Sequence, residues 1–173
     1  MAKAVITTIG TDRPGLVAEL SSAAQTAGLN IEDSRMTVLG GEFAILMAVE
    51  GATDALNGFE TNLRERAGDN LAYLFRRTDG PPSPRAARSY IASLSALDHP
   101  GIVASIATFF SQRQINIRDL NTETTPAPHT GIPMFRVHLS VEIPLEQRIH
   151  DLKEAFDAFC ADGDLDGTLE VDI

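Results

Sequence analysis

Two short stretches of the sequence are nearly the same: residues 12–18 read DRPGLVA and residues 98–104 read DHPGIVA. A second pair, NIED at residues 30–33 and NIRD at residues 116–119, has the same separation of 86 positions (98 − 12 and 116 − 30). Aligned without gaps at this separation, residues 12–33 share eight identities in 22 positions with the second copy. Chance, at about one in seventeen per position, would give one or two. The chain is therefore expected to contain an internal duplication and to fold as two similar units.

The segment between the two copies predicts a linker. Residues 78–85 read TDGPPSPR, and this run of one glycine and three prolines cannot continue a helix or a central strand. We therefore expect domain 1 at residues 1–78, a proline-rich linker at residues 79–87, and domain 2 at residues 88–173.

The two copies predict the same order of elements. Short β-branched segments predict strands, and apolar residues at helical spacing predict amphipathic helices that face a sheet. In the first copy we expect strands at residues 4–10, 31–39, 43–49 and 71–75, with helices from Pro14 and Thr53. In the second copy we expect strands at residues 90–97, 115–122, 135–143 and 168–173, with helices from Pro100 and Leu145. The order β-α-β-β-α-β, found twice, predicts an α+β protein of two tandem ferredoxin-like domains, each an antiparallel sheet with its helices on one face.

The composition excludes several classes of function. There are 14 Lys and Arg residues against 24 Asp and Glu residues, a net charge of −10, whereas direct binding to DNA or to an anionic membrane needs a basic patch. The sole cysteine, Cys160, excludes an intramolecular disulfide, and its place beside Phe156 and Phe159 predicts core packing. No stretch approaches the ~20 apolar residues of a membrane span. We expect a cytoplasmic protein that binds neither nucleic acid nor membrane.

The repeated Asp-x-Pro-Gly motif is the candidate ligand site. It brings a strand to the start of a helix, where unsatisfied N–H groups and a partial positive charge suit a carboxylate. In the first copy, Gly15 has no side chain to block a ligand, Asp12 could bind an ammonium group, and Asn30 could donate and accept at the same ligand. The matching residues of the second copy are Asp98, Gly101 and Asn116. Such a site would suit a zwitterionic amino acid, and the alternative is that each Asp caps its helix and each Asn bonds to nearby backbone.

The sequence gives little support for a metal site or a catalytic site. Residues 162–167 read DGDLDG, like the first half of an EF-hand loop, but the twelfth position of such a loop is Ile173 where a glutamate belongs. No histidine spacing is typical of a metal site, and the chain has no Gly-x-Ser-x-Gly elbow, P-loop or Gly-x-Gly-x-x-Gly after a strand. We therefore expect no metal, no cofactor and no catalytic residues.

These motifs resemble a known family. The DRPGLV helix start and the Asn-Ile strand start resemble the ACT domain, a ferredoxin-like regulatory module, and the tandem spans nearly the whole chain. The first copy, with NIEDSRM at residues 30–36 and LGGEF at residues 39–43, resembles more narrowly the glycine cleavage system transcriptional repressor family.

The resemblance implies an amino-acid-responsive regulatory protein that is not an enzyme. It implies a small amino acid such as glycine or serine as ligand, and contact with a LysR-type transcriptional regulator in place of direct DNA binding. The ligand-binding residues that it implies are Asp12, Gly15, Leu16, Asn30 and Ile31 in the first copy and Asp98, Gly101, Ile102 and Asn116 in the second. Two alternatives stay open: a free-standing regulatory subunit of an amino-acid metabolic enzyme, and a tandem ACT scaffold that binds no ligand.

Both faces of the strand expected at residues 43–49 are apolar. Phe43, Ile45, Met47 and Val49 lie on one side of this strand, and Ala44, Leu46 and Ala48 lie on the other. Because the helices of such a domain cover only one face of the sheet, the second apolar face is expected to meet the other domain or another chain. We expect the two domains to pair and the protein to form a homodimer. The same alternation places His138 of the second copy on the face away from the helices.

Overall fold

The chain forms two compact units in the computed structural model, Met1–Pro82 (domain 1) and Ser83–Ile173 (domain 2). The structure describes residues 1–66, 70–80, 86–127 and 130–172. Residues 81–85, which belong to the expected linker, and Ile173, the twelfth position of the EF-hand comparison, lie outside the described ranges.

Each domain has the predicted β-α-β-β-α-β order. The elements of domain 1 are β1 (Ala2–Thr11), α1 (Leu16–Thr26), β2 (Asn30–Leu39), β3 (Glu42–Gly51), α2 (Thr53–Arg66) and β4 (Leu71–Thr78). Those of domain 2 are β5 (Ala87–Leu97), α3 (Ile102–Gln112), β6 (Asn116–Pro126), β7 (Pro133–Pro144), α4 (Ile149–Asp162) and β8 (Asp166–Val171). The strands pair antiparallel in the orders β2-β3-β1-β4 and β6-β7-β5-β8. The predicted α+β class with two ferredoxin-like domains is confirmed.

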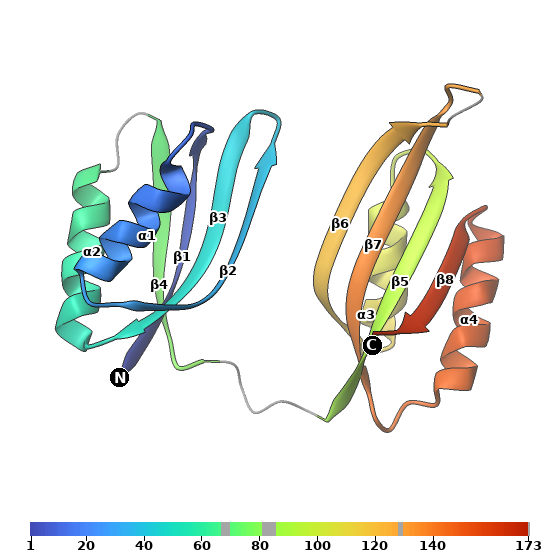
Figure 1. Ribbon diagram of the computed structural model, residues 1–173. Coiled ribbons are helices and arrows are strands. Elements are labelled where there is room, and N and C mark those ends of the chain that lie inside the picture. The colour runs from blue at the N-terminus through green and yellow to red at the C-terminus, as the bar shows by residue number, and fades with distance from the viewer. Residues whose placement is uncertain (67–69, 81–85, 128–129, 173) are drawn as a thin grey trace. The chain divides into compact units, whose positions relative to one another are not determined.

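The helices of each domain lie on one side of its sheet (Figure 1), and side-chain alternation decides which residues they cover. Along β1, Ala4, Ile6 and Thr8 are buried, whereas the residues between them face outward. The inner residues of β3 and the apolar stripes of α1 and α2 complete the core of domain 1. The alternating residues of the strands and the apolar stripes of the two helices therefore form a single core between sheet and helices.

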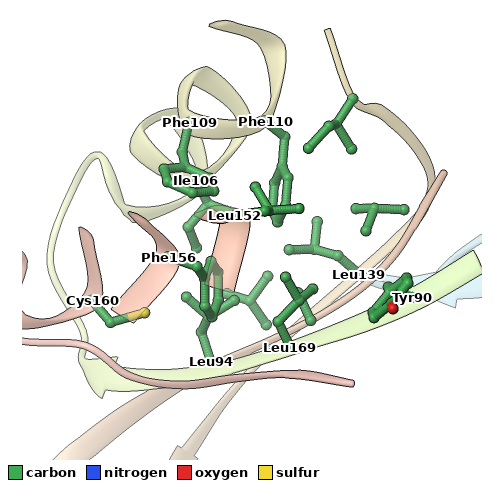
Figure 2. Packing of buried hydrophobic residues seen from close by; sticks show 14 of the residues in the cluster. Tyr90, Leu94, Ile106, Phe109, Phe110, Leu139, Leu152, Phe156, Cys160 and Leu169 are labelled. Carbon is green, nitrogen blue, oxygen red and sulfur yellow. The ribbon is translucent and has the colours of Figure 1, made fainter. Parts of the chain in front are cut away.

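The core of domain 2 is richer in aromatic residues. The ring centroid of Phe109 lies 4.8 Å from that of Phe159 and 5.7 Å from that of Phe156. Figure 2 shows Phe109, Phe110 and Phe156 pointing into the space between the helices and the sheet. Cys160 lies in the same core at 5% exposure, and this burial raises the pKa of its thiol to about 11. The predicted core position of Cys160 is confirmed.

Three of the four described helices begin later than the sequence predicts. We expected helices from Pro14, Pro100 and Leu145, but α1, α3 and α4 begin at Leu16, Ile102 and Ile149. The N-cap residues of α1 and α3 are Gly15 and Gly101, with left-handed φ values of 95° and 102°. Because an α-helix requires negative φ, each preceding proline stays in the loop. Leu145 lies outside α4, where it is 47% exposed.

The outer faces of the two sheets differ in chemistry. In domain 1, Thr7 lies directly between Leu46 of β3 and Leu74 of β4, which are 47% and 66% exposed. In domain 2, the equivalent row is Ser93 between His138 and Thr168, and the Ser93 hydroxyl lies 3.1 Å from His138 Nδ1. His138 is thus on the outer face, as its alternation predicts. The second apolar face predicted for residues 43–49 is an exposed surface of domain 1 taken by itself.

Candidate functional site

The loop from β1 to α1 is tied to the sheet and leaves the helix start without a side-chain cap. The Asp12 backbone N–H donates to the Gly41 carbonyl at 3.2 Å, and the Gly15 carbonyl accepts from the Glu19 N–H at 2.9 Å. No side chain caps α1 or α3. Neither Asp12 nor Asp98 is therefore a helix cap, and the first-turn N–H groups of α1 stay available to an anion.

A bidentate ion pair stands beside this loop in domain 1. The two terminal nitrogens of Arg13 donate to the two carboxylate oxygens of Glu19 at 2.6 and 2.7 Å. The hydrogen bonds to Glu19 and its negative charge raise the pKa of Arg13 above its usual value. The residue equivalent to Arg13 in domain 2 is His99, whose Nδ1 lies 3.1 Å from the Pro100 carbonyl oxygen. The two copies of the loop therefore differ at this position: an arginine paired with a glutamate in domain 1, and a histidine beside its own backbone in domain 2.

A cavity of about 510 Å³ opens directly beside the loop of domain 1. Asp12, Arg13 and Glu19 lie along it, together with Thr11 and Asn70. The apolar part of its wall comes from α1, α2 and β4, and consists of Leu16, Leu20, Ala23, Leu63 and Leu71. This volume falls in the range of about 300–1,000 Å³ that is typical of small-molecule sites. The structure thus brings the sequence-predicted Asp12 and Leu16 together at one concave site.

Most of this apolar wall was not expected from the sequence. Leu63 and Leu71 follow the loop by about fifty residues, and a local motif carries no information on such neighbours. Gly10, at the end of β1, shows how closely the segments meet, because a Cβ built there would lie 2.1 Å from the Asn70 carbonyl oxygen. One signal was available: Ala23 stands where the second copy has Phe109, at the repeat separation of 86 (109 − 23).

The second-copy residues line a different and more open hollow. Asp98, Gly101 and Ile102 share it with Ala107 and Phe135. The Asp98 backbone N–H donates to the Pro133 carbonyl at 3.2 Å, as Asp12 does to Gly41. The loop geometry is thus repeated in domain 2, while the surroundings of the loop are not.

The two asparagines lie at the other end of each sheet. Asn30 of β2 and Lys3 of β1 are both paired with Glu50 of β3, so Asn30 lies at the Lys3 end of the sheet. Asp12 lies at the opposite end, because its neighbour Thr11 is paired with Glu42. The eight residue steps from Lys3 to Thr11 span about 27 Å at ~3.4 Å per residue. Within one domain, Asp12 and Asn30 therefore cannot contact the same amino acid, contrary to the expectation from their spacing.

The other predicted residues of this end have structural contacts. Asn116 Nδ2 donates to a carboxylate oxygen of Glu142 at 3.2 Å. Ile31 is partly buried against the core of domain 1, at a register shift in the β2–β3 pairing. Both contacts favour a role in the fold for Asn116 and Ile31.

Comparison with known proteins identifies both domains. Residues 3–72 and residues 90–157 each match the ACT domain. The chain belongs to the ACT-domain family. Since the two matches account for most of the chain and the fold repeats, it is a tandem ACT protein.

Relatives with the same tandem arrangement are known. The chain is 28% identical over 168 residues to the glycine cleavage system transcriptional repressor of Escherichia coli, a match that covers 96% of this chain and 88% of that protein. It is also similar to a solved structure assigned to the same group of repressors, with 30% identity, 98% and 96% coverage and a TM-score of 0.72. A protein of unknown function from Galdieria sulphuraria has a TM-score of 0.83 with 29% identity and 99% coverage of both chains. This homology supports a regulatory ACT protein.

Within the described ranges, no three His, Cys, Asp or Glu side chains are grouped in a way that could hold a metal ion. The acidic segment at residues 162–167 connects the end of α4 to the start of β8. Among the helices that the structure describes, none is long and apolar enough to cross a membrane.

Proposed function

We propose that this tandem ACT protein is an amino-acid-responsive regulator that controls transcription indirectly, by binding a regulator protein of the LysR type. The observation that carries the proposal is the similarity to the glycine cleavage system transcriptional repressor along 96% of this chain and 88% of the relative. Similarity over both domains favours a shared role for the whole tandem, because a shared module would match only one of them.

The amino-acid site of the proposal is the loop of domain 1 with its cavity. The Asp12 carboxylate is exposed, and no described residue donates a side-chain hydrogen bond to it, so it can bind an ammonium group. The first-turn N–H groups after Gly15 face the same loop and suit a carboxylate. Leu16 connects this polar mouth to the cavity. Asp98, Gly101 and Ile102 offer the same loop in domain 2, with His99 in place of Arg13.

The charge of the chain favours protein contact over nucleic-acid contact. At a net charge of −10, the chain would be repelled by the phosphate backbone, whose neutralisation supplies most non-specific affinity for DNA. We therefore propose that repression acts through the partner protein in the cytoplasm, without a catalytic step. The exposed apolar row of domain 1 around Leu46 supports a protein-binding role.

Co-purification from native lysate tests the partner class. The tagged full chain is captured with and without a mixture of amino acids, and the eluted proteins are identified by mass spectrometry. We expect a LysR-type regulator whose recovery depends on the amino acids, and loss of that dependence in Asp12→Ala. Recovery of an amino-acid metabolic enzyme in its place would contradict the proposal and favour a free-standing regulatory subunit.

A further inference from the structure

We propose that the cavity of domain 1 binds the side chain of an amino acid with a large apolar side chain, such as leucine or phenylalanine. This inference rests on the proposed function, because it names the ligand class of the same site. It differs from the small amino acid, glycine or serine, that the family resemblance implies.

The cavity has a charged mouth and an apolar interior. Asp12 and Arg13 are exposed at the mouth. Leu16, Leu20 and Leu63, which form the interior wall, are only 2% to 6% exposed. An amino acid bound here would keep its ammonium and carboxylate groups at the mouth, where they are solvated or paired. Its side chain would enter the interior, where only apolar atoms are stabilised.

The cavity exists because one residue of α1 is small. Helices α1 and α3 align along their whole length at the repeat separation of 86 (102 − 16 and 112 − 26), so Ala23 corresponds to Phe109. The ring of Phe109 is 4% exposed and packs against Phe156 and Phe159. Figure 2 shows Phe109 and Phe156 in the same core. In domain 2 the Phe109 ring occupies the inner part of the space between the two helices, and the hollow that remains there, lined by Phe109 and Phe159, is more open than the cavity of domain 1. In domain 1 the Ala23 methyl group leaves this space open to a ligand.

The apolar wall of the cavity favours a ligand with a large apolar side chain. Glycine has no side chain, and serine has only a hydroxymethyl group, so neither would bury much apolar surface against the leucine and alanine side chains of the wall. A leucine or phenylalanine side chain would bury its apolar surface against the same wall. We expect a difference in affinity of about tenfold or more between these two groups of ligands.

Isothermal titration calorimetry of the full chain tests the inference. The titrants are glycine, serine, leucine, phenylalanine and, as a charged comparison, glutamate. Leucine or phenylalanine is expected to bind at least about tenfold more tightly than glycine or serine. Ala23→Phe, which places the side chain of domain 2 in domain 1, is expected to abolish this binding.

A control variant shows whether a loss of binding in Ala23→Phe comes from filling the cavity or from adding an aromatic ring elsewhere on the same helix. Gln25 lies on the same helix and is exposed, so Gln25→Phe is expected to keep the wild-type affinity. Circular dichroism and the Tm without ligand check that Ala23→Phe is folded. If it is not, Ala23→Leu fills the cavity with a smaller side chain and is expected to lower the affinity for phenylalanine at least about tenfold.

The outcomes distinguish this inference from the proposed function. Tighter binding of glycine or serine than of leucine and phenylalanine, unaffected by the Ala23 variants, would overturn the inference and leave amino-acid sensing intact. Absence of binding by all five amino acids would overturn both. Equal loss of affinity in Gln25→Phe and Ala23→Phe would also overturn the cavity as the binding site.

Discussion

At the scale of single residues, the backbone conformation at position 15 requires a glycine. Its φ of 95° lies in the left-handed region, and a Cβ built there meets only Glu19 Oε1, at 3.9 Å. The reason for the glycine is therefore conformational, because the surrounding space would admit a side chain. The sequence interpretation, that Gly15 keeps the way open for a ligand, stays a prediction, and the backbone gives an independent reason for the glycine.

Gly15→Ala is expected to lower the free energy of unfolding by roughly 1–2 kcal/mol, because an L-residue is strained at this φ. Gly58, in the middle of α2 with open space around its Cβ position, is the matched control. Gly58→Ala is expected to raise the free energy of unfolding by about 0.5–1 kcal/mol, since alanine favours a helix. Urea denaturation measures both, and changes of the same sign would contradict this account.

Cys160 gives the stability a dependence on pH. Burial raises the pKa of its thiol to about 11, whereas an unfolded cysteine ionises near pH ~8.5. Between these values the unfolded chain releases a proton that the folded chain retains, so the free energy of unfolding falls as the pH rises. We expect this fall between about pH 8.5 and 11 in wild type to be steeper than in Cys160→Ala. Parallel denaturation curves for the two proteins would contradict it.

At the scale of elements, the β-α-β order itself separates Asp12 from Asn30. Strand β1 ends at the loop of the candidate site, α1 returns the chain to the other end, and β2 starts there (Figure 1). The order of elements was predictable from hydrophobic periodicity, and it already implied this separation. The fifteen-residue spacing between Gly15 and Asn30, taken alone, suggested the opposite.

Asp12→Ala and Asn30→Ala are therefore expected to differ. In titrations with leucine, Asp12→Ala should lower the affinity about tenfold or more, because it removes a charged partner of the ammonium group. Asn30→Ala, at the far end of the sheet, should change it by less than about twofold. Equal losses would indicate a site shared between two copies of the chain.

Two features of the site could not be predicted from the sequence: the start of α1 and the cavity. Pro14 is common in the first turn of helices, so the sequence placed the helix start there, and only the positive φ of Gly15 corrects it. The cavity depends on packing between α1, α2 and β4. Such tertiary neighbours leave no local pattern, although the replacement of Phe109 by Ala23 between the copies pointed to them.

At the scale of the whole molecule, the two domains share one fold but differ on the outer faces of their sheets. The Thr7 row on the outer face of domain 1 carries Leu46 and Leu74, and the equivalent row of domain 2 carries His138 and Thr168. An exposed apolar row on one domain favours association through that domain. If the protein forms the homodimer expected from the sequence, we propose that this row of domain 1 lies in the contact.

Leu46→Arg is expected to raise the dimer Kd about tenfold or more, because it places a charge in the middle of the apolar row. The matched control is His138→Arg, at the equivalent position of domain 2, which should leave the oligomeric state unchanged. Light scattering over a concentration series measures both. A wild-type protein that is monomeric at all concentrations would contradict the expected dimer.

Hydrogen–deuterium exchange of the full chain, with and without leucine, tests whether the amino acid binds at the cavity of domain 1. We expect slower amide exchange at residues 12–20 and at residues 71–74, around the cavity of domain 1. We expect unchanged exchange at the equivalent loop and helix of domain 2, residues 98–106. Protection of the domain 2 loop, or of the Asn30 end of domain 1, would contradict it, as would the same exchange with and without ligand.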